Sequence, residues 1–319
     1  MTGLLSVFAS VVLPIVAVSA VGYLLGHARD VDVGSLNAVA IYALLPALVF
    51  HSLATTTFDR GTVLTVLGGV ALYVLAMVAV TEGVGRLLGD TEPLLSALVL
   101  VSVFPNSGNY GIPLAEFAFD GVGRDTAVLF LVGQSVLFWT VGVAIASRGS
   151  GATARTAMTS ILRLPLLYAV AAAGLARWLG VVPPAGSTAM ATLSLVGNAA
   201  IPVMLLILGI QLSEVDYATT VSRLGTATIL KMGVAPVVGL LVALAVGFED
   251  PTVARVFVLE TATPAAVTVL VLLIEVAGDA TVDGVAVSEY ASAAVLTTTL
   301  VSIPVLTAVI ALLEAGVVF

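Results

Sequence analysis

The chain has 319 residues, of which 60% are hydrophobic and only 9% are charged, and it contains no cysteine. Soluble domains carry roughly 25% charged residues, so these charges are too few to cover a water-soluble globule, and the apolar content excludes a disordered chain. The net charge of −8 argues against nucleic acid as a partner. Without cysteine, disulfides, thiolate metal sites and cysteine nucleophiles are excluded.

Ten apolar segments are long enough to cross a bilayer, which takes about 20 helical residues. They are, in chain order, Leu4–Leu25, Leu36–Leu53, Thr62–Thr81, Leu94–Phe119, Thr126–Ser147, Ile161–Leu179, Thr188–Leu212, Leu224–Val246, Thr252–Ala277 and Tyr290–Leu313. No lysine or arginine precedes Arg29, so we expect the first segment to be a retained span and not a cleaved signal peptide. No loop is long enough for a soluble domain, which places the function within the membrane.

The arginines set the expected orientation, because cytoplasmic loops are enriched in basic residues. If the N-terminus is outside, the odd-numbered loops are cytoplasmic. These loops and their flanks hold six arginines, whereas the even-numbered loops hold four. Three of the six lie in or beside the central loop, namely Arg148, Arg155 and Arg163. We therefore expect a multi-pass protein of the cytoplasmic membrane with both termini outside.

The fourth segment contains the polar stretch Phe104–Leu114, FPNSGNYGIPL. Proline removes a backbone donor and glycine weakens a helix, so we expect the helix to unwind here. Freed backbone groups at this depth must face a polar cavity or packed protein. The second half-helix would point its positive N-terminal end into that space, which suits an anion. A proline kink satisfied by neighbouring helices is the alternative. The candidate substrate-binding residues are Pro105, Asn106, Ser107, Gly108, Asn109 and Tyr110.

Two isolated charged residues lie in the eighth and ninth segments. Lys231 is the only lysine, and Glu260 lies one turn before Pro264 in the stretch LETATPAAVT. A carboxylate at this depth is costly unless it is protonated, paired or bound to a cation. Glu260 is therefore a candidate proton carrier, sodium ligand or structural partner of Lys231. Lys231 could instead attract an anionic substrate, whereas a retinal Schiff base does not fit ten spans and two tryptophans.

The fourth and ninth segments match at an offset of 159 residues, which superimposes Pro105 on Pro264 and Glu116 on Glu275. The simplest unit is five spans, duplicated, and because five is odd the second copy is inverted. The predicted domains are a first repeat at residues 1–147, a cytoplasmic linker at 148–160 and a second repeat at 161–319. Inverted repeats with broken helices are typical of secondary transporters.

The remaining polar residues give weaker signals. Four amides are expected to hydrogen-bond between helices: Asn37, Gln134, Asn198 and Gln211. Glu82 and Arg86 are spaced for a local ion pair, and His51 is expected near the membrane surface. The sequence has no HExxH, GxSxG or Walker A motif and only two histidines, so we expect neither an enzyme nor a metal or cofactor site.

The broken fourth segment resembles the asparagine-glycine-proline segment of the auxin efflux carrier family. LLPALVFHSLA in the second segment and NAAIPVMLLILGIQLS in the seventh are similar to that family too, so the resemblance covers the whole chain and fits its short-looped prokaryotic members. It implies a fold similar to the sodium/bile-acid symporters, with ten helices in two inverted repeats and with helices 4 and 9 crossing at their breaks. Spans 1, 2, 6 and 7 would form a scaffold, against which spans 3–5 and 8–10 would move as an elevator.

The resemblance also implies a secondary transporter for a small organic anion, such as indole acetate or a dicarboxylate. Carried over by motif, the ligand-contacting candidates are Asn106, Ser107, Asn109, Pro264 and Ala265. Glu260 resembles the cation-site glutamate of the bile-acid symporters, which leaves H⁺ or Na⁺ as the candidate coupling ion. The expected partners are the substrate and the lipid bilayer, with a homodimer left open.

Voltage favours export, because one anionic charge that leaves a negative interior gains about 2.3 kcal/mol per 100 mV. The alternative is proton- or sodium-coupled uptake of organic acids. A channel, or a sensor that binds without transport, is a third option from a different class.

Overall fold

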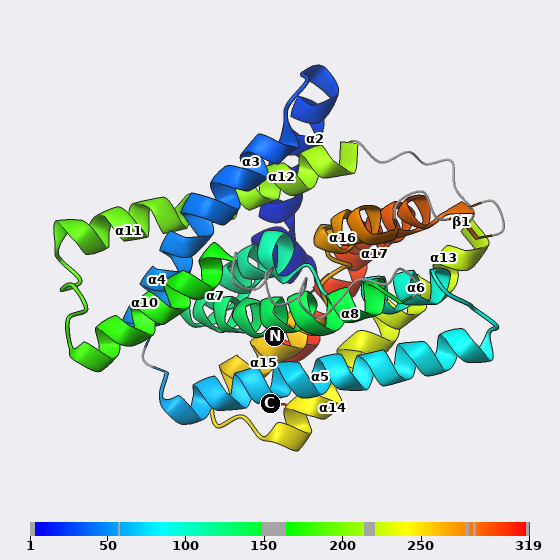
Figure 1. Cartoon of the computed structure of the whole chain (residues 1–319). Coiled ribbons are helices and arrows are strands. Elements are labelled where there is room, and N and C mark those ends of the chain that lie inside the picture. Colours follow the sequence, from blue (N-terminus) through cyan, green and yellow to red (C-terminus); the bar gives the residue numbers. More distant parts are fainter. Residues whose placement is uncertain are drawn as a thin grey trace.

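The computed structural model describes residues 4–56, 58–148, 164–213, 221–277, 281–282, 285–316 and 319, which are mostly helical (Figure 1). The helices of the first half, with π-helical turns marked η, are α1 (Leu4–Val7), η1 (Phe8–Val12), α2 (Leu13–Ala28), α3 (Val33–Val39), η2 (Ala40–Leu44), α4 (Leu45–Thr55), α5 (Arg60–Leu87), α6 (Leu94–Val103), η3 (Ser107–Gly111), α7 (Ile112–Leu137), η4 (Phe138–Gly142) and α8 (Val143–Ala146).

The second half continues the same pattern and adds one small hairpin. Its elements are α10 (Pro165–Leu179), α11 (Thr188–Asn198), α12 (Ala200–Ser213), α13 (Val221–Ile229), η5 (Leu230–Val234), α14 (Ala235–Val246), α15 (Pro251–Thr261), α16 (Val267–Ala277), the antiparallel strands β1 (Thr281–Val282) and β2 (Val285–Ala286), and α17 (Val287–Glu314). The all-α fold class is confirmed, with this hairpin of two-residue strands as the one local departure among the described residues. Its β-branched threonine and valines favour extended backbone.

Seven helical stretches of the described chain are long and apolar enough to cross a membrane, and three shorter apolar helices accompany them. The shorter ones are Leu94–Val103, Pro165–Leu179 and Val267–Val276. The sixth predicted span starts at Ile161, but its helix begins at Pro165, a residue suited to the first helical position. Apart from Arg148, the predicted linker 148–160 lies outside the described residues, and the ten-span topology stays a prediction.

Several prolines lie inside helices just after a π-helical turn. Pro14, Pro46, Pro113 and Pro236 each occupy the second residue of the α-helix that follows η1, η2, η3 or η5. In a regular α-helix a proline ring clashes with the carbonyl four residues earlier, and the wider turn relieves that clash. The unwinding expected over Phe104–Leu114 is therefore too broad: only Phe104–Asn106 leaves the helix, and Pro113 is tolerated.

The helices α2 and α12 cross with their backbones in direct contact. A Cβ added at Gly22 would lie 2.2 Å from the Leu206 carbonyl oxygen, and one added at Gly209 would lie 1.9 Å from the Ser19 carbonyl oxygen. Small residues allow helices to approach this closely in a membrane, where packing drives helix association. Substitution of either glycine by a larger residue would force the two helices apart.

The helices pack in two groups, each of which draws on both halves of the chain. The first group contains α2–α4 and α10–α12, with α2 on α12 and with α4 on α10 and α11, whereas α1 packs on α17. In the second group, α5 packs on α6, α7 and α14, while α15 packs on α7 and α16 on α17. Figure 1 shows α4, α10 and α11 at one side of the molecule and α5 running along its lower edge with α14.

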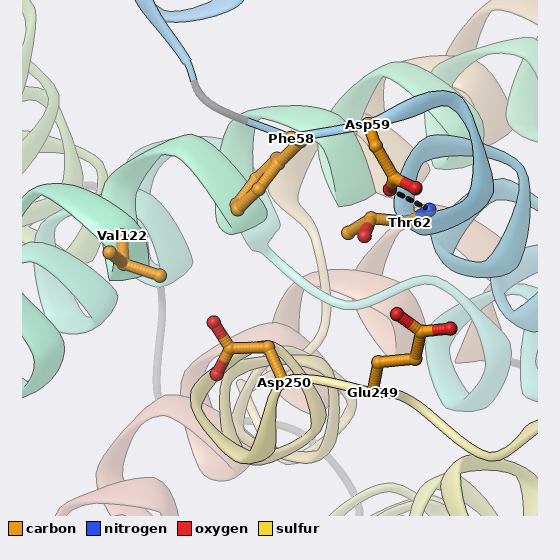
Figure 2. A pocket seen from close by; sticks show the side chains of 6 residues that line it. All are labelled: Phe58, Asp59, Thr62, Val122, Glu249 and Asp250. Atoms are coloured by element: carbon orange, nitrogen blue, oxygen red, sulfur yellow. Dashed lines mark hydrogen bonds between the residues drawn. The ribbon is translucent and has the colours of Figure 1, made fainter.

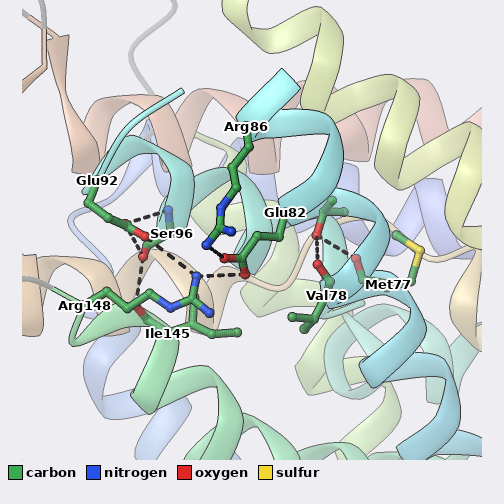
Figure 3. A network of polar contacts seen from close by, with 9 residues as sticks. Met77, Val78, Glu82, Arg86, Glu92, Ser96, Ile145 and Arg148 are labelled. Atoms are coloured by element: carbon green, nitrogen blue, oxygen red, sulfur yellow. Dashed lines mark hydrogen bonds and ion pairs between the residues drawn. The ribbon is translucent and has the colours of Figure 1, made fainter. Parts of the chain in front are cut away.

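A polar network joins the ends of α5, α6 and α8 (Figure 3). Arg148 lies 2.9 Å from a Glu82 oxygen and 3.7 Å from a Glu92 oxygen. Glu82 also pairs with Arg86, as their spacing predicts. The Ser96 hydroxyl donates to Glu92 at 2.5 Å, so a carboxylate lies at the N-terminal end of α6, where it is favourable.

Candidate functional site

The two broken helices meet at their breaks. The segment between α6 and η3 lies antiparallel to the segment between α15 and α16. The Asn106 N–H donates to the Pro264 carbonyl at 2.8 Å, and the Ala266 N–H donates to the Phe104 carbonyl at 3.0 Å. Each broken helix therefore satisfies backbone groups that the other has lost, which hydrocarbon could not do.

Pro105 and Ala265 occupy the centre of this crossing, where they form an isolated antiparallel bridge. Proline has no N–H to donate, so α6 ends before Pro105 and α15 ends before Pro264. The sequence offset of 159 residues aligns Pro105 with Pro264 as equivalent positions of a repeat, but it does not say that the two breaks lie close together. The structure brings the two breaks together in space, as the resemblance implied.

Asn106 lies beside the bridge and has a buried side-chain donor that the described residues leave unused. Its side chain is only 6% exposed, and its amide nitrogen Nδ2 has no hydrogen-bond partner among the described residues. Its backbone carbonyl accepts from the Tyr110 N–H at 3.2 Å and the Gly111 N–H at 2.9 Å, which begins the π-helical turn. A buried donor without a partner costs about 1–3 kcal/mol, so it marks a place for an acceptor.

The other predicted residues of the first break differ in their environment. Ser107 is fully buried, and its hydroxyl donates to Gln134 Oε1 at 2.9 Å. The hydroxyl of Tyr110 lies 3.3 Å from that of Ser302 on α17. Gly108 and Asn109 are half-buried and are the more accessible part of the turn. Pro264 and Ala265 are buried in the opposite break.

Glu260 reaches from α15 to the other broken helix. Its side chain is fully buried, and neither carboxylate oxygen has a hydrogen-bond partner among the described residues. A Cβ added at Gly111 would lie 2.1 Å from Oε2 and 2.6 Å from Oε1. The carboxyl group therefore rests directly against the η3 turn, in space that only a glycine leaves open.

Lys231 approaches the same region from η5. It is fully buried, and its ammonium group donates to the Thr261 carbonyl at 3.2 Å. Among the described residues it forms no direct salt bridge with Glu260, whose oxygens lack partners. The two side chains still lie close enough for their charges to interact, so the structural pairing of Glu260 with Lys231 stays a prediction.

Two hydroxyl residues on α17 support the crossing, although no sequence motif points to them. Thr298 Oγ1 accepts from the Ala265 N–H at 3.2 Å, and Ser302 lies beside Tyr110. The expected role of Gln134 is confirmed, since it bonds to another segment. By contrast, the Asn198 amide bonds to Ser194 at 3.3 Å within its own helix α11, so its predicted role is wrong.

A separate pocket of about 350 Å³ opens at the ends of α5 and α15 (Figure 2). It is lined by Phe58, Asp59, Thr62, Val122, Glu249 and Asp250. Asp59 and Asp250 cap helix N-termini, where they accept from the Thr62 N–H at 2.8 Å and the Thr252 N–H at 2.7 Å. The Thr62 contact lowers the pKa of Asp59. This pocket was not predicted, and none of its lining residues belongs to the crossing.

Long apolar helices, together with two broken helices that pair in the interior, define a multi-pass membrane protein with polar residues at its centre. The description of the protein family that matches the chain is "membrane transport protein", and the match covers residues 7–310. The protein therefore belongs to this family of transporters, the auxin efflux carrier family, which confirms the resemblance seen in the sequence. Comparison with curated proteins gives no match.

Proposed function

We propose that this protein is a secondary carrier that moves a small organic anion, a carboxylate, across the cytoplasmic membrane by alternating access, with export favoured. The observation that carries the proposal is the crossing of the two breaks, with the unpartnered Asn106 amide beside it. Broken helices that meet at mid-depth are the usual site of substrate in secondary transporters.

The pairing of helices supports the inverted repeat. In the first group α2 packs on α12 and α4 packs on α10, and in the second α6 packs on α17 and α15 on α7. In terms of the ten predicted spans, span 1 packs on span 7 and span 2 on span 6, while span 4 packs on span 10 and span 5 on span 9. Within each pair of contacts, the second follows from the first when the two halves are exchanged. A two-fold relation between the halves would produce this pattern. The two groups then correspond to the scaffold and the moving bundle of an elevator.

Contacts at the helix ends support the ten-span topology. The pocket of Figure 2 joins the second, fourth and eighth loops, all even, whereas the network of Figure 3 joins the third and fifth, both odd. Arg177, at the end of the sixth span, donates to the Leu53 carbonyl at 2.9 Å, at the end of the second span. With ten spans, all even loops lie on one side of the membrane and both termini lie there too.

Three features of the crossing suit an anion. Asn106 offers a free donor, and the helices that follow the two breaks begin beside it with their partial positive charge. Lys231 adds a basic group near the second break. The negative interior of a cell then drives the bound anion outward.

Coupled uptake is the second candidate, and Glu260 is the observation that favours it. A fully buried carboxyl group whose oxygens have no partner needs a proton or a cation. Its contact with the η3 turn at Gly111 would make the substrate site sensitive to that ion. Either H⁺ or Na⁺ could fill this role.

The test is flux in liposomes that contain the purified protein, with acetate, succinate, benzoate and indole-3-acetate as probes and with pH and sodium varied. A carrier gives saturable flux with counterflow, a channel gives flux without counterflow, and a sensor binds without flux. Asn106→Ala should abolish or weaken the flux. Asn198→Ala is the matched control, because Asn198 is exposed and, in the part of the chain that the structure describes, bonds only within α11. Equal effects of the two substitutions would place the site elsewhere.

A further inference from the structure

Each strand of the crossing is held by one side chain from the same half of the molecule. Gln134 of α7 donates its Nε2 hydrogen to the Pro105 carbonyl at 2.8 Å. In the other half, Thr298 of α17 accepts from the Ala265 N–H at 3.2 Å. Pro105 and Ala265 are the two residues that face each other at the bridge, so both contacts act on its centre.

Gln134 also fixes the residues on either side of Asn106. Its Oε1 accepts from the Ser107 hydroxyl at 2.9 Å while its Nε2 bonds to Pro105, so one buried amide spans the bend in which Asn106 lies. An amide that donates and accepts at once has a single orientation that satisfies both contacts. The direction of the Asn106 side chain therefore depends on Gln134.

This arrangement shows which side-chain donors remain available for a ligand at the crossing. A serine hydroxyl has one hydrogen, and the Ser107 hydroxyl donates its hydrogen to Gln134. The Asn106 Nδ2 remains without a partner among the described residues. A ligand at the crossing would thus find its donor on Asn106, while Ser107 belongs to the support.

We propose that Gln134 and Thr298 are positioning residues of the substrate site, which hold the two breaks in the geometry that presents Asn106. The inference rests on the proposed function for its substrate, but the two contacts themselves do not. Neither residue needs to touch the substrate. Loss of either contact should therefore move the turn that contains Asn106 and Asn109.

Thr298 offers a closely matched test, because Thr299 is its neighbour on the same helix. Among the described residues the Thr299 hydroxyl bonds only to the Val295 carbonyl of α17, at 2.7 Å, whereas that of Thr298 also accepts from the Ala265 N–H. Thr298→Val should raise the apparent KM for succinate or indole-3-acetate counterflow at least threefold. Thr299→Val should leave it unchanged, and Thr298→Ser should restore it. A lower melting temperature with an unchanged KM in Thr298→Val would overturn the proposal.

A second readout needs no substrate. The chain has no cysteine, so Asn109→Cys places a single thiol on the half-buried part of the turn. We expect Gln134→Leu to change the rate of its modification by a charged methanethiosulfonate severalfold, with Thr140→Val, which removes a hydroxyl that bonds only within its own helix, as the control.

The two readouts separate the proposals. If the wild type carries neither acid, the proposed substrate class fails, and the thiol rate still decides whether Gln134 positions the turn. If Gln134→Leu folds poorly, Gln134→Met, which keeps the length of the side chain but lacks both polar contacts, should change the same rate. An unchanged thiol rate in whichever of these variants folds would refute the positioning role.

Discussion

The contact between Gly111 and Glu260 allows a sharp test, because a single methyl group should disturb it. In Gly111→Ala the new Cβ would lie 2.1, 2.6 and 2.7 Å from the two oxygens and Cδ of Glu260. Carbon and oxygen atoms need roughly 3.4 Å or more, so the carboxyl group must move by about an ångström inside a packed interior. Such overpacking costs about 1–3 kcal/mol of unfolding free energy.

The same turn supplies the control. A Cβ at Gly108 would lie 3.9 Å from the methyl groups of Leu131, which is ordinary contact. Gly108→Ala should therefore leave stability unchanged or raise it by a few tenths of a kcal/mol, since alanine restricts the unfolded chain. Denaturant unfolding in detergent would measure both variants. In Gly111→Ala/Glu260→Ala the carboxyl group is absent, so the cost of the methyl group should largely disappear.

The result that would refute this reasoning is equal stability of Gly111→Ala and Gly108→Ala. Failure of Glu260→Ala to relieve the Gly111→Ala defect would equally show that the methyl group meets something else.

Four further outcomes are expected. Asn109→Ala should weaken substrate binding by about 1 kcal/mol, roughly fivefold in Kd, measured by counterflow or calorimetry, with little loss of thermal stability. Glu260→Gln should remove pH-driven net flux while keeping exchange if a proton is coupled, or remove the sodium dependence of binding if sodium is; unimpaired driven transport would exclude a coupling role. Lys231→Met should not rescue a Glu260→Gln stability defect, because Lys231 bonds to the Thr261 carbonyl and forms no direct ion pair with Glu260 among the described residues. The Thr62 N–H lowers the pKa of Asp59, so the wild type should have a higher free energy of unfolding than Asp59→Asn. This difference should be complete above the ordinary pKa of 3.8 and should fade as the pH falls through the lowered pKa. Unfolding at a series of pH values would measure it.

Much of the fold followed from composition and proline positions. Apolar length located the helices, and Pro105 and Pro264 located the two breaks, because a missing N–H and a ring clash act locally. The extent of the first break was predicted too broadly, since the π-helical turn at Ser107–Gly111 depends on how neighbouring helices accommodate Pro113.

The support of the site could not be predicted in the same way. Thr298 and Ser302 look like many hydroxyl residues that bond back to their own helix, and both also do so. Their contacts with Ala265 and Tyr110 arise only when distant segments pack. The role of Gly111 could not be predicted for the same reason. A glycine in the sequence indicates a flexible backbone, but it does not show which side chain occupies the space that a Cβ would fill.

The pairing of the two breaks also bears on how the protein is made. The Asn106 N–H and Phe104 carbonyl find their partners at Pro264 and Ala266, which the ribosome adds more than 150 residues later. Until then the first broken helix holds backbone groups that hydrocarbon cannot satisfy. Until the second half is inserted, water, the insertion machinery or a temporary helical form must therefore satisfy the backbone groups at the first break. A chain that ends before Pro264 could not form the paired breaks.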